Sequence, residues 1–123
     1  MKIIATEHAP AAIGPYSQGM VVGELVFTSG QIPINPASGA IEAEGIEAQA
    51  AQSIRNVAAV LEAAGSDLSK VIKTTCFLAN MGDFAAFNAV YEELFPGKPA
   101  RSCVEVAALP KGALCEVEAI AEL

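Results

Sequence analysis

The stretch from Ile46 to Ala64 constrains the fold more than any other part of the chain. Its apolar residues recur at helical spacing, and Gly65 follows at the point where a helix would stop. The residues that set the spacing are Ile46, Ala50, Ile54, Val57, Leu61 and Ala64. A helix with one apolar stripe has to bury that stripe against a second layer of structure, which the rest of the chain must supply.

Segments rich in β-branched and aromatic residues lie on both sides of this helix and predict the second layer. The predicted strands are Val21–Val22, Leu25–Thr28, Lys70–Ala79, Arg101–Ala107 and Leu114–Ala121. Gly23 and Glu24 between the first two indicate a tight hairpin. Residues 29–45 are rich in proline and glycine and predict a loop.

A second helix is predicted after Asp83, which can cap its N-terminus, and it ends before Pro96. The resulting order, ββ-α-β-α-ββ, is typical of an α+β fold with two helices on one face of a mixed sheet. With 123 residues, the chain has the size of a single domain, residues 1–123.

Polar and apolar residues alternate along the last two predicted strands, which places each polar set on one face of the sheet. The polar residues are Arg101, Cys103 and Glu105 in the first strand and Glu116, Glu118 and Glu122 in the second. If the chain turns back after Ala107 as a hairpin, Glu105 lies opposite Glu116 and both sets share the face away from the helices. Carboxylates directly opposite each other are destabilising, so this face is either simply solvated or a subunit interface that holds a site.

Charge and hydropathy exclude several classes of function. Fourteen acidic against seven basic residues give a net charge of −7, which argues against nucleic acid or an anionic membrane as a partner. No apolar run is long enough for a transmembrane helix and no secretory signal is visible, so we expect a soluble, cytoplasmic protein. A mean hydropathy of +0.43 is high for such a chain and favours apolar surface covered by another subunit.

Few residues are available for catalysis. The thiols are Cys76, Cys103 and Cys115. They form no CxxC pair or zinc motif, and the single histidine, His8, lies in an N-terminal segment predicted to be mobile, so cysteine–histidine catalysis is disfavoured. No glycine-rich phosphate motif is present. Arg101 is the remaining candidate, because a planar guanidinium can hold a substrate carboxylate, with an ion pair to Glu105 or Glu118 as the alternative.

Six motifs, in order along the chain, resemble the RidA (YjgF/UK114) family. They are PAAIGPYSQG at residues 10–19, TSGQIP at 28–33, KTT at 73–75, FN at 87–88, PARSCVEV at 99–106 and EVEA at 116–119. The resemblance runs from Thr6 to the C-terminus without large insertions. Together the motifs are far more specific than any one of them.

The resemblance implies a chorismate-mutase-like protomer that forms a homotrimer, with sites in the clefts between subunits. It also implies hydrolysis of 2-imino acids, such as 2-iminopropanoate and 2-iminobutanoate, to 2-keto acids and ammonia, with no cofactor and no metal. By the same resemblance Arg101 holds the substrate carboxylate and Glu116 positions the attacking water, helped by the backbone of Cys103. The pocket-lining positions of the family are matched by Tyr16, Ser29, Gly30 and Asn88.

The residues by themselves leave simpler roles open for several of these positions. Tyr16 could pack within its Gly-Pro-Tyr turn, Ser29 and Gly30 could form an ordinary turn, and Asn88 could make hydrogen bonds on a helix surface. Three departures from the family pattern bear on substrate preference: the short segment 96–99, Ala108 and Cys115.

Other functions also remain open within the family. One is a non-catalytic trimer that senses 2-keto acids through the same arginine, and another is a chaperone-like role. A ribonuclease role, attributed to some relatives, fits poorly with the net charge of −7 and the single histidine.

Overall fold

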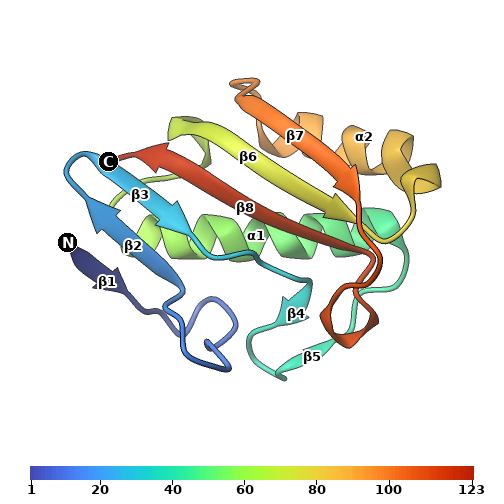
Figure 1. Ribbon diagram of the computed structural model, residues 1–123, viewed down its shortest axis with the longest axis horizontal. Helices are drawn as coiled ribbons and strands as arrows, with labels where there is room; N and C mark the ends of the chain where they lie inside the picture. The colour runs from blue at the N-terminus through green and yellow to red at the C-terminus, as the bar shows by residue number, and fades with distance from the viewer.

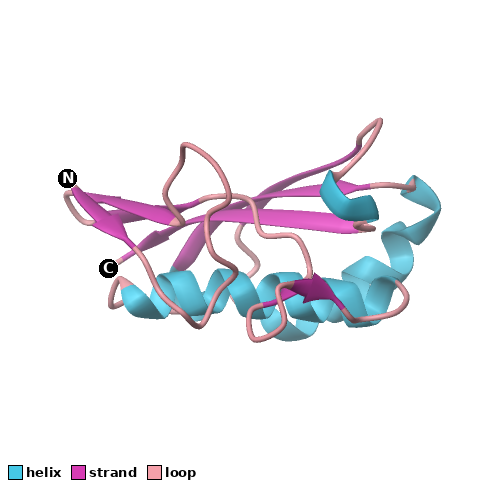
Figure 2. Ribbon diagram, turned by 90° about the horizontal axis from the view of Figure 1, so that it is seen from below, coloured by secondary structure: helices cyan, strands magenta, loops and turns pink.

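The computed structural model describes residues 1–123 and consists of a six-stranded mixed sheet with both helices on one face. The strands are β1 (Lys2–Ile4), β2 (Gly19–Val22), β3 (Leu25–Thr28), β6 (Val71–Leu78), β7 (Ala100–Glu105) and β8 (Cys115–Glu122), in the spatial order β1-β2-β3-β8-β6-β7. The helices are α1 (Ile46–Ala63) and α2 (Phe84–Leu94). Figure 1 shows the strand order, and Figure 2 shows α1 and α2 together beneath one face of the sheet. The predicted α+β architecture is confirmed.

The main core lies between α1 and the sheet. Ile54, Val57 and Leu61 on α1 are fully buried, and so is Val117 on the central strand β8. After α1 the chain leaves the helix at Gly65, whose φ of 89° favours glycine. The stripe that predicted this helix is therefore the stripe that it buries. Neither helix combines the length and the hydropathy needed to cross a membrane.

The start of α2 differs from the prediction. Asp83 occupies the position before the helix, but its side chain makes no capping hydrogen bond. Its backbone, at φ −87° and ψ 1°, already belongs to the 3₁₀ turn Met81–Asp83, whereas a capping residue is normally extended. The cap lies earlier, because the side chain of Asn80 accepts a hydrogen bond from the backbone N–H of Gly82 at 2.7 Å.

The structure contains two pairings that the sequence analysis missed. β1 pairs with β2, and Ile4 is buried, so the N-terminal segment predicted to be mobile is an edge strand. Within residues 29–45, predicted as a loop, β4 (Ile34–Asn35) pairs with β5 (Ala40–Ile41). Strands of two or three residues are too short to show a polar–apolar alternation.

The hairpin predicted for the last two strands is wrong. β6 lies between β7 and β8, parallel to β7 and antiparallel to β8. Glu105 is paired with Leu78 and Glu116 with Phe77, so the two carboxylates do not face each other across a ladder. The physical reason is the crossover through α2: a strand that returns to the sheet by way of a helix lies parallel to the strand before it.

This topology places the two polar sets on opposite faces, which corrects the expectation that they share one. Residues paired across neighbouring strands point to the same face. Arg101 and Cys103 pair with Thr74 and Cys76, which are buried beneath the helices. Glu116 and Glu118 pair with Phe77 and Thr75 on the face that carries no helix. Arg101 and Glu116 of one chain are therefore separated by the sheet.

Candidate functional site

Arg101 lies on the edge strand β7 and turns its guanidinium onto α2. Its Nη1 donates a 2.7 Å hydrogen bond to Oδ1 of Asn88. Its Cζ lies 4.7 Å from the ring centroid of Tyr91 and 5.5 Å from that of Phe84. These contacts hold the arginine by one amide and two aromatic rings, with no carboxylate among them.

The alternative of an ion pair between Arg101 and a glutamate of the sheet is not formed. The Oε1 atom of Glu105 accepts a hydrogen bond from the backbone N–H of Met81 at 2.7 Å. Glu118 lies on the opposite face of the sheet, opposite Thr75. The unused N–H donors of Arg101 therefore stay available for an anion from outside the chain.

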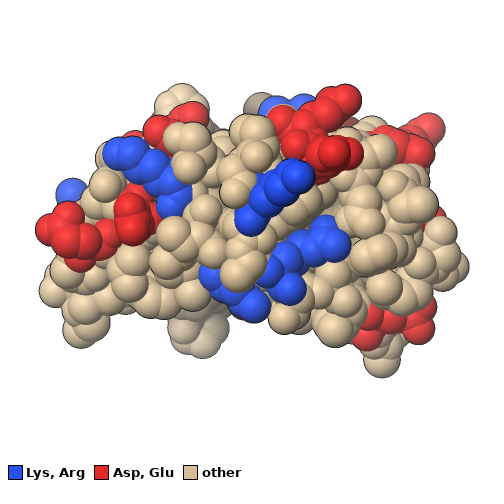
Figure 3. Space-filling model, turned by 90° about the horizontal axis from the view of Figure 1, so that it is seen from above, with Lys and Arg blue, Asp and Glu red and all other residues tan.

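A cavity of about 550 Å³ opens beside this arginine between α2 and β7. Asn88, Tyr91, Lys98 and Arg101 are among the residues that line it. Figure 3 shows several basic side chains near the middle of this edge of the molecule, with one group of acidic side chains beside them and others toward its ends. Two basic side chains and one acidic side chain, Glu92, line the cavity, so its lining is net positive in a protein with a net charge of −7, which favours an anionic ligand.

The cysteines do not supply a nucleophile. Burial raises the pKa of Cys76 to about 12 and that of Cys115 to about 11. Burial also raises the pKa of Cys103, and the nearby charge of Arg101 offsets this only in part. All three thiols stay protonated at neutral pH, which makes them poor nucleophiles. No group of three or more His, Cys, Asp or Glu side chains is arranged to hold a metal ion.

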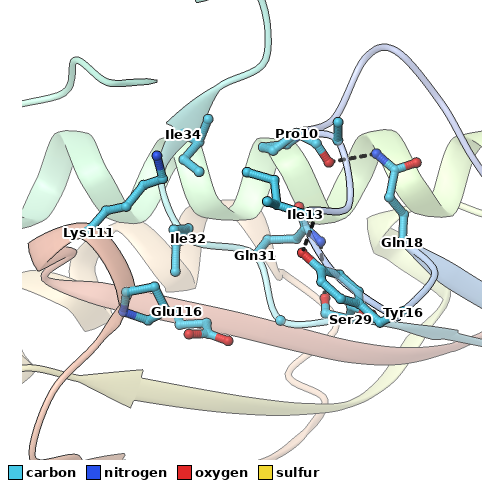
Figure 4. A pocket seen from close by; sticks show the side chains of 13 residues that line it. Pro10, Ile13, Tyr16, Gln18, Ser29, Gln31, Ile32, Ile34, Lys111 and Glu116 are labelled. Atoms are coloured by element: carbon cyan, nitrogen blue, oxygen red, sulfur yellow. Dashed lines mark hydrogen bonds between the residues drawn. The ribbon is translucent and has the colours of Figure 1, made fainter. Parts of the chain in front are cut away.

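A second cavity, of about 480 Å³, contains Glu116 (Figure 4). Glu116 extends from β8, Ser29 and Gly30 follow the end of β3, and Tyr16 lies on the loop before β2. Lys111 lines the same cavity from the turn before β8, where its φ is 58°, a strained backbone conformation for a lysine. The structure thus brings together four of the predicted site residues: Tyr16, Ser29, Gly30 and Glu116.

Gly30 allows the loop after β3 to pass directly over the Glu116 carboxylate. A Cβ atom at position 30 would lie 2.0 Å from Oε1 of Glu116, so no larger side chain fits without moving the carboxylate. The next residue, Gln31, exchanges two backbone hydrogen bonds of 2.8 and 3.1 Å with Val117, which fixes the loop against β8. Glycine at position 30 therefore leaves room for the Glu116 carboxylate in its present position, and no unusual φ is involved.

The environment of Glu116 makes its carboxylate a stronger base. The side chain is half-buried, and burial raises its pKa, with a further increase from the negative charge of Glu118 on the same face. A raised pKa increases the affinity of the ionised carboxylate for a proton. This property suits a group that takes a proton from water.

Gln18 is a site residue that the sequence reasoning missed. Its Oε1 accepts a 2.6 Å hydrogen bond from the backbone N–H of Thr6, and its Nε2 donates to the carbonyl oxygens of Thr6, Ala9 and Pro10. This one buried amide holds the N-terminal segment as a wall of the Glu116 cavity (Figure 4). Gln18 lies within the motif at residues 10–19, but a motif does not reveal which chain segments a side chain joins.

One chain therefore carries two separate half-sites. Arg101 and Asn88 line the cavity between α2 and β7, and Tyr16, Ser29, Gly30 and Glu116 line the other. The two cavities share no lining residue, and Cys103 lines neither. The predicted site residues are consequently not gathered into a single pocket of one chain.

Comparison with known proteins gives consistent full-length matches. A family model described as endoribonuclease L-PSP matches residues 6–123. The 2-iminobutanoate/2-iminopropanoate deaminase of Salmonella typhimurium is 56% identical over 124 residues, covering 98% of this chain and 96% of the relative. AldR of Lactococcus lactis, whose name describes it as a regulator, is also 56% identical over 124 residues, covering 100% and 98%. The crystal structure of Escherichia coli TdcF with bound serine superposes with a TM-score of 0.95 at 47% identity, covering 100% of this chain and 99% of that one.

Proposed function

The chain belongs to the endoribonuclease L-PSP family, which is the RidA (YjgF/UK114) family, and on this premise we propose that it is a hydrolytic deaminase of 2-imino acids. The reaction adds water to the imine carbon of a 2-imino acid and releases ammonia, leaving a 2-keto acid. The substrates are the small ones that the name of the Salmonella typhimurium relative states, 2-iminobutanoate and 2-iminopropanoate. The reaction needs no cofactor, because small imines already react with water, and the cytoplasm is the expected compartment.

The observation that carries the proposal is the arrangement of Arg101. Its guanidinium is held by Asn88 and the ring of Tyr91 while it keeps unused N–H donors beside an open cavity. A planar guanidinium with free donors binds a carboxylate through two parallel hydrogen bonds. The substrate carboxylate would bind there. Cys103, whose backbone would help to position the water, lies two residues later on the same strand.

Glu116 supplies the second function, which is to position and deprotonate the attacking water. Its carboxylate accepts a proton from the water as the oxygen attacks the imine carbon, and the proton is then passed to the departing nitrogen. Its half-buried position and raised pKa support this role. Tyr16, Ser29 and Gly30 shape the cavity around it.

Separation of the two half-sites supports a shared site between subunits of a homotrimer. Arg101 and Glu116 of one chain lie on opposite faces of the sheet, so a site with both requires two chains. The sheet face without helices also exposes large apolar side chains, including Phe27 and Val104, which a neighbouring subunit would cover. Association would therefore bury apolar surface and complete the site at the same time.

A sensing role is the second candidate, and the AldR relative, with its regulator name, is the observation that favours it. A sensor would bind a 2-keto acid through Arg101 and would not need Glu116 as a base. Substitution of Glu116 separates the two functions: Glu116→Gln should leave 2-keto-acid binding intact and reduce turnover. If the wild-type protein binds a 2-keto acid but does not hydrolyse imines, the sensing function is correct.

The proposal is tested by generating the imine in the presence of the protein. A pyridoxal-phosphate-dependent dehydratase acting on threonine or serine releases the substrate, and the decay of the imine is followed with and without the protein. We expect faster decay with the wild type and a loss of roughly 100-fold or more with Arg101→Ala, because the carboxylate loses its partner. Arg101→Lys should also be poor, since an ammonium lacks the planar pair of donors.

Arg55, the only other arginine, provides the matched control. It lies on α1, donates to Oε1 of Gln52 at 3.4 Å and lines neither cavity. Arg55→Ala removes the same charge and should keep full activity. Full activity in Arg101→Ala would refute the proposed mechanism.

A further inference from the structure

The motif at residues 73–75 contains a buried hydroxyl for which the proposed reaction has no use. Thr74 lies on β6, is fully buried, and places its Oγ1 atom 2.7 Å from the hydroxyl oxygen of Tyr91 on α2. The Sγ atom of Cys76 donates to the same Oγ1 at 3.9 Å. A hydrogen bond made entirely inside the core thus ties the end of the Tyr91 side chain to the middle of the sheet.

The ring of Tyr91 is fixed by its neighbours as well as by this hydrogen bond. Its centroid lies 4.6 Å from that of Phe95 and 5.9 Å from that of Phe87. With its hydroxyl bonded to Thr74 and aromatic neighbours around it, the ring cannot turn without breaking several contacts. The remaining ring contact is the one with Arg101, whose Cζ lies 4.7 Å from the centroid.

This contact is made with the Tyr91 ring and with no hydrogen-bond acceptor. A guanidinium that lies on an aromatic ring uses its π-face, whereas carboxylate binding uses the N–H groups in its plane. Asn88 accepts one hydrogen bond, from Nη1, out of the five that the group can donate. The Arg101 side chain is therefore held in place while most of its N–H donors form no hydrogen bond.

We propose that Tyr91, fixed by its hydrogen bond to Thr74, is the positioning residue for Arg101 and presets the guanidinium plane for the carboxylate. The proposal rests on the proposed function, because it concerns the arginine to which that function assigns substrate binding. An arginine without this support has to be ordered when the substrate binds, and that loss of freedom weakens binding. The water at Glu116, held by other residues, is unaffected, so the cost falls on KM and not on kcat.

The main test compares Tyr91→Leu with Tyr91→Phe in the imine assay, together with the Kd for 2-oxobutanoate. Tyr91→Leu removes the ring and should raise both KM and Kd about tenfold, the scale of one partly buried cation–π contact, with kcat within about threefold of wild type. Tyr91→Phe keeps the ring and should restore most of the loss. If Tyr91→Phe is as impaired as Tyr91→Leu, the ring is not what positions the arginine, and the proposal is overturned.

Thr74→Val tests the hydrogen bond with minimal change in shape. Thr74→Val and Tyr91→Phe each remove one partner of the same bond, so each should raise KM by about threefold and the double variant by no more than either. Both changes are conservative, and they keep the proposal testable if Tyr91→Leu fails to fold. An unchanged KM in both single variants, or additive effects in the double variant, would contradict the proposal.

Val26→Ala is the matched control for a purely structural effect. Val26 is fully buried on β3, which β8 and β6 separate from β7, and it lines neither cavity. It should lower the melting temperature while leaving KM unchanged. If Tyr91→Leu behaves in the same way while Arg101→Ala is inactive, Tyr91 only packs the core and this inference alone fails. Full activity in Arg101→Ala would instead refute the proposed function, on which this inference rests.

Discussion

Two variants that are each inactive should restore activity when they are allowed to exchange subunits. The reason is the placement of Arg101 beneath the helices and of Glu116 on the other face of the same sheet. If each site takes Arg101 from one chain and Glu116 from its neighbour, a mixed trimer of Arg101→Ala and Glu116→Gln subunits contains some sites in which both wild-type residues meet.

The expected recovery follows from this geometry. A site is intact only when the chain that contributes Arg101 carries Glu116→Gln and the chain that contributes Glu116 carries Arg101→Ala. With equal amounts and random assembly, about one-quarter of the sites meet both conditions, so activity should return to about one-quarter of the wild-type value. Recovery should be greatest at equal amounts, because it depends on the product of the two subunit fractions.

The assay mixes the purified variants, unfolds and refolds them together, and measures imine decay before and after exchange. Native mass spectrometry confirms that mixed trimers have formed. The control mixes wild type with the double variant Arg101→Ala/Glu116→Gln, for which exchange should reduce activity from about one-half to about one-quarter of the wild-type value. If mixed trimers form and the two single variants stay inactive, the shared-site reasoning is refuted.

Three further predictions concern the Glu116 cavity. The pKa of Glu116 is raised and its ionised form is the base, so kcat should fall as the pH drops through that raised pKa. Glu118→Gln removes one of the two causes of the raised pKa and should move this acid limb of the pH–rate profile to lower pH. An unmoved limb would assign it to another group. Gly30→Ala places a Cβ atom 2.0 Å from Oε1 of Glu116 and should displace the carboxylate. We expect kcat to fall by about tenfold or more while the melting temperature stays near normal. A wild-type kcat would contradict the close approach. Gln18→Leu removes the buried amide that holds the N-terminal segment and should lower the free energy of unfolding, measured in urea, by about 2 kcal/mol or more. A loss below about 0.5 kcal/mol would mean that other contacts hold the segment.

The sequence was sufficient to predict the elements whose pattern is local. The periodicity from Ile46 to Ala64 predicted α1, and the β-branched run within residues 70–79 predicted β6, because each element repeats its apolar residues often enough to show a period. Alternation along β7 and β8 correctly separated the residues of each strand into two faces. It could not reveal which strand lies beside which, and the predicted hairpin failed because the crossover through α2 inserts β6 between them.

The sequence motifs selected candidate site residues but did not show how they are arranged. The motifs around Arg101 and Glu116 selected both side chains, yet no local pattern shows that the sheet separates them. The contacts of Thr74 with Tyr91 and of Gln18 with Pro10 join segments that come together only in the folded chain. Such contacts depend on the complete topology, which local sequence patterns do not specify.

The strict alternation along β8 has a consequence for how this strand can change during evolution. Cys115, Val117, Ala119 and Ala121 are buried against the helices, and Glu116 lies between the first two on the other face. Substitutions at even-numbered positions can therefore alter the chemistry of the cavity without disturbing the packing of α1. Insertion or deletion of a single residue would exchange the two sets, placing carboxylates in the core and apolar side chains in the cavity. Selection for a new substrate should consequently alter side chains at even positions while the number of residues from Leu114 to Glu122 stays constant.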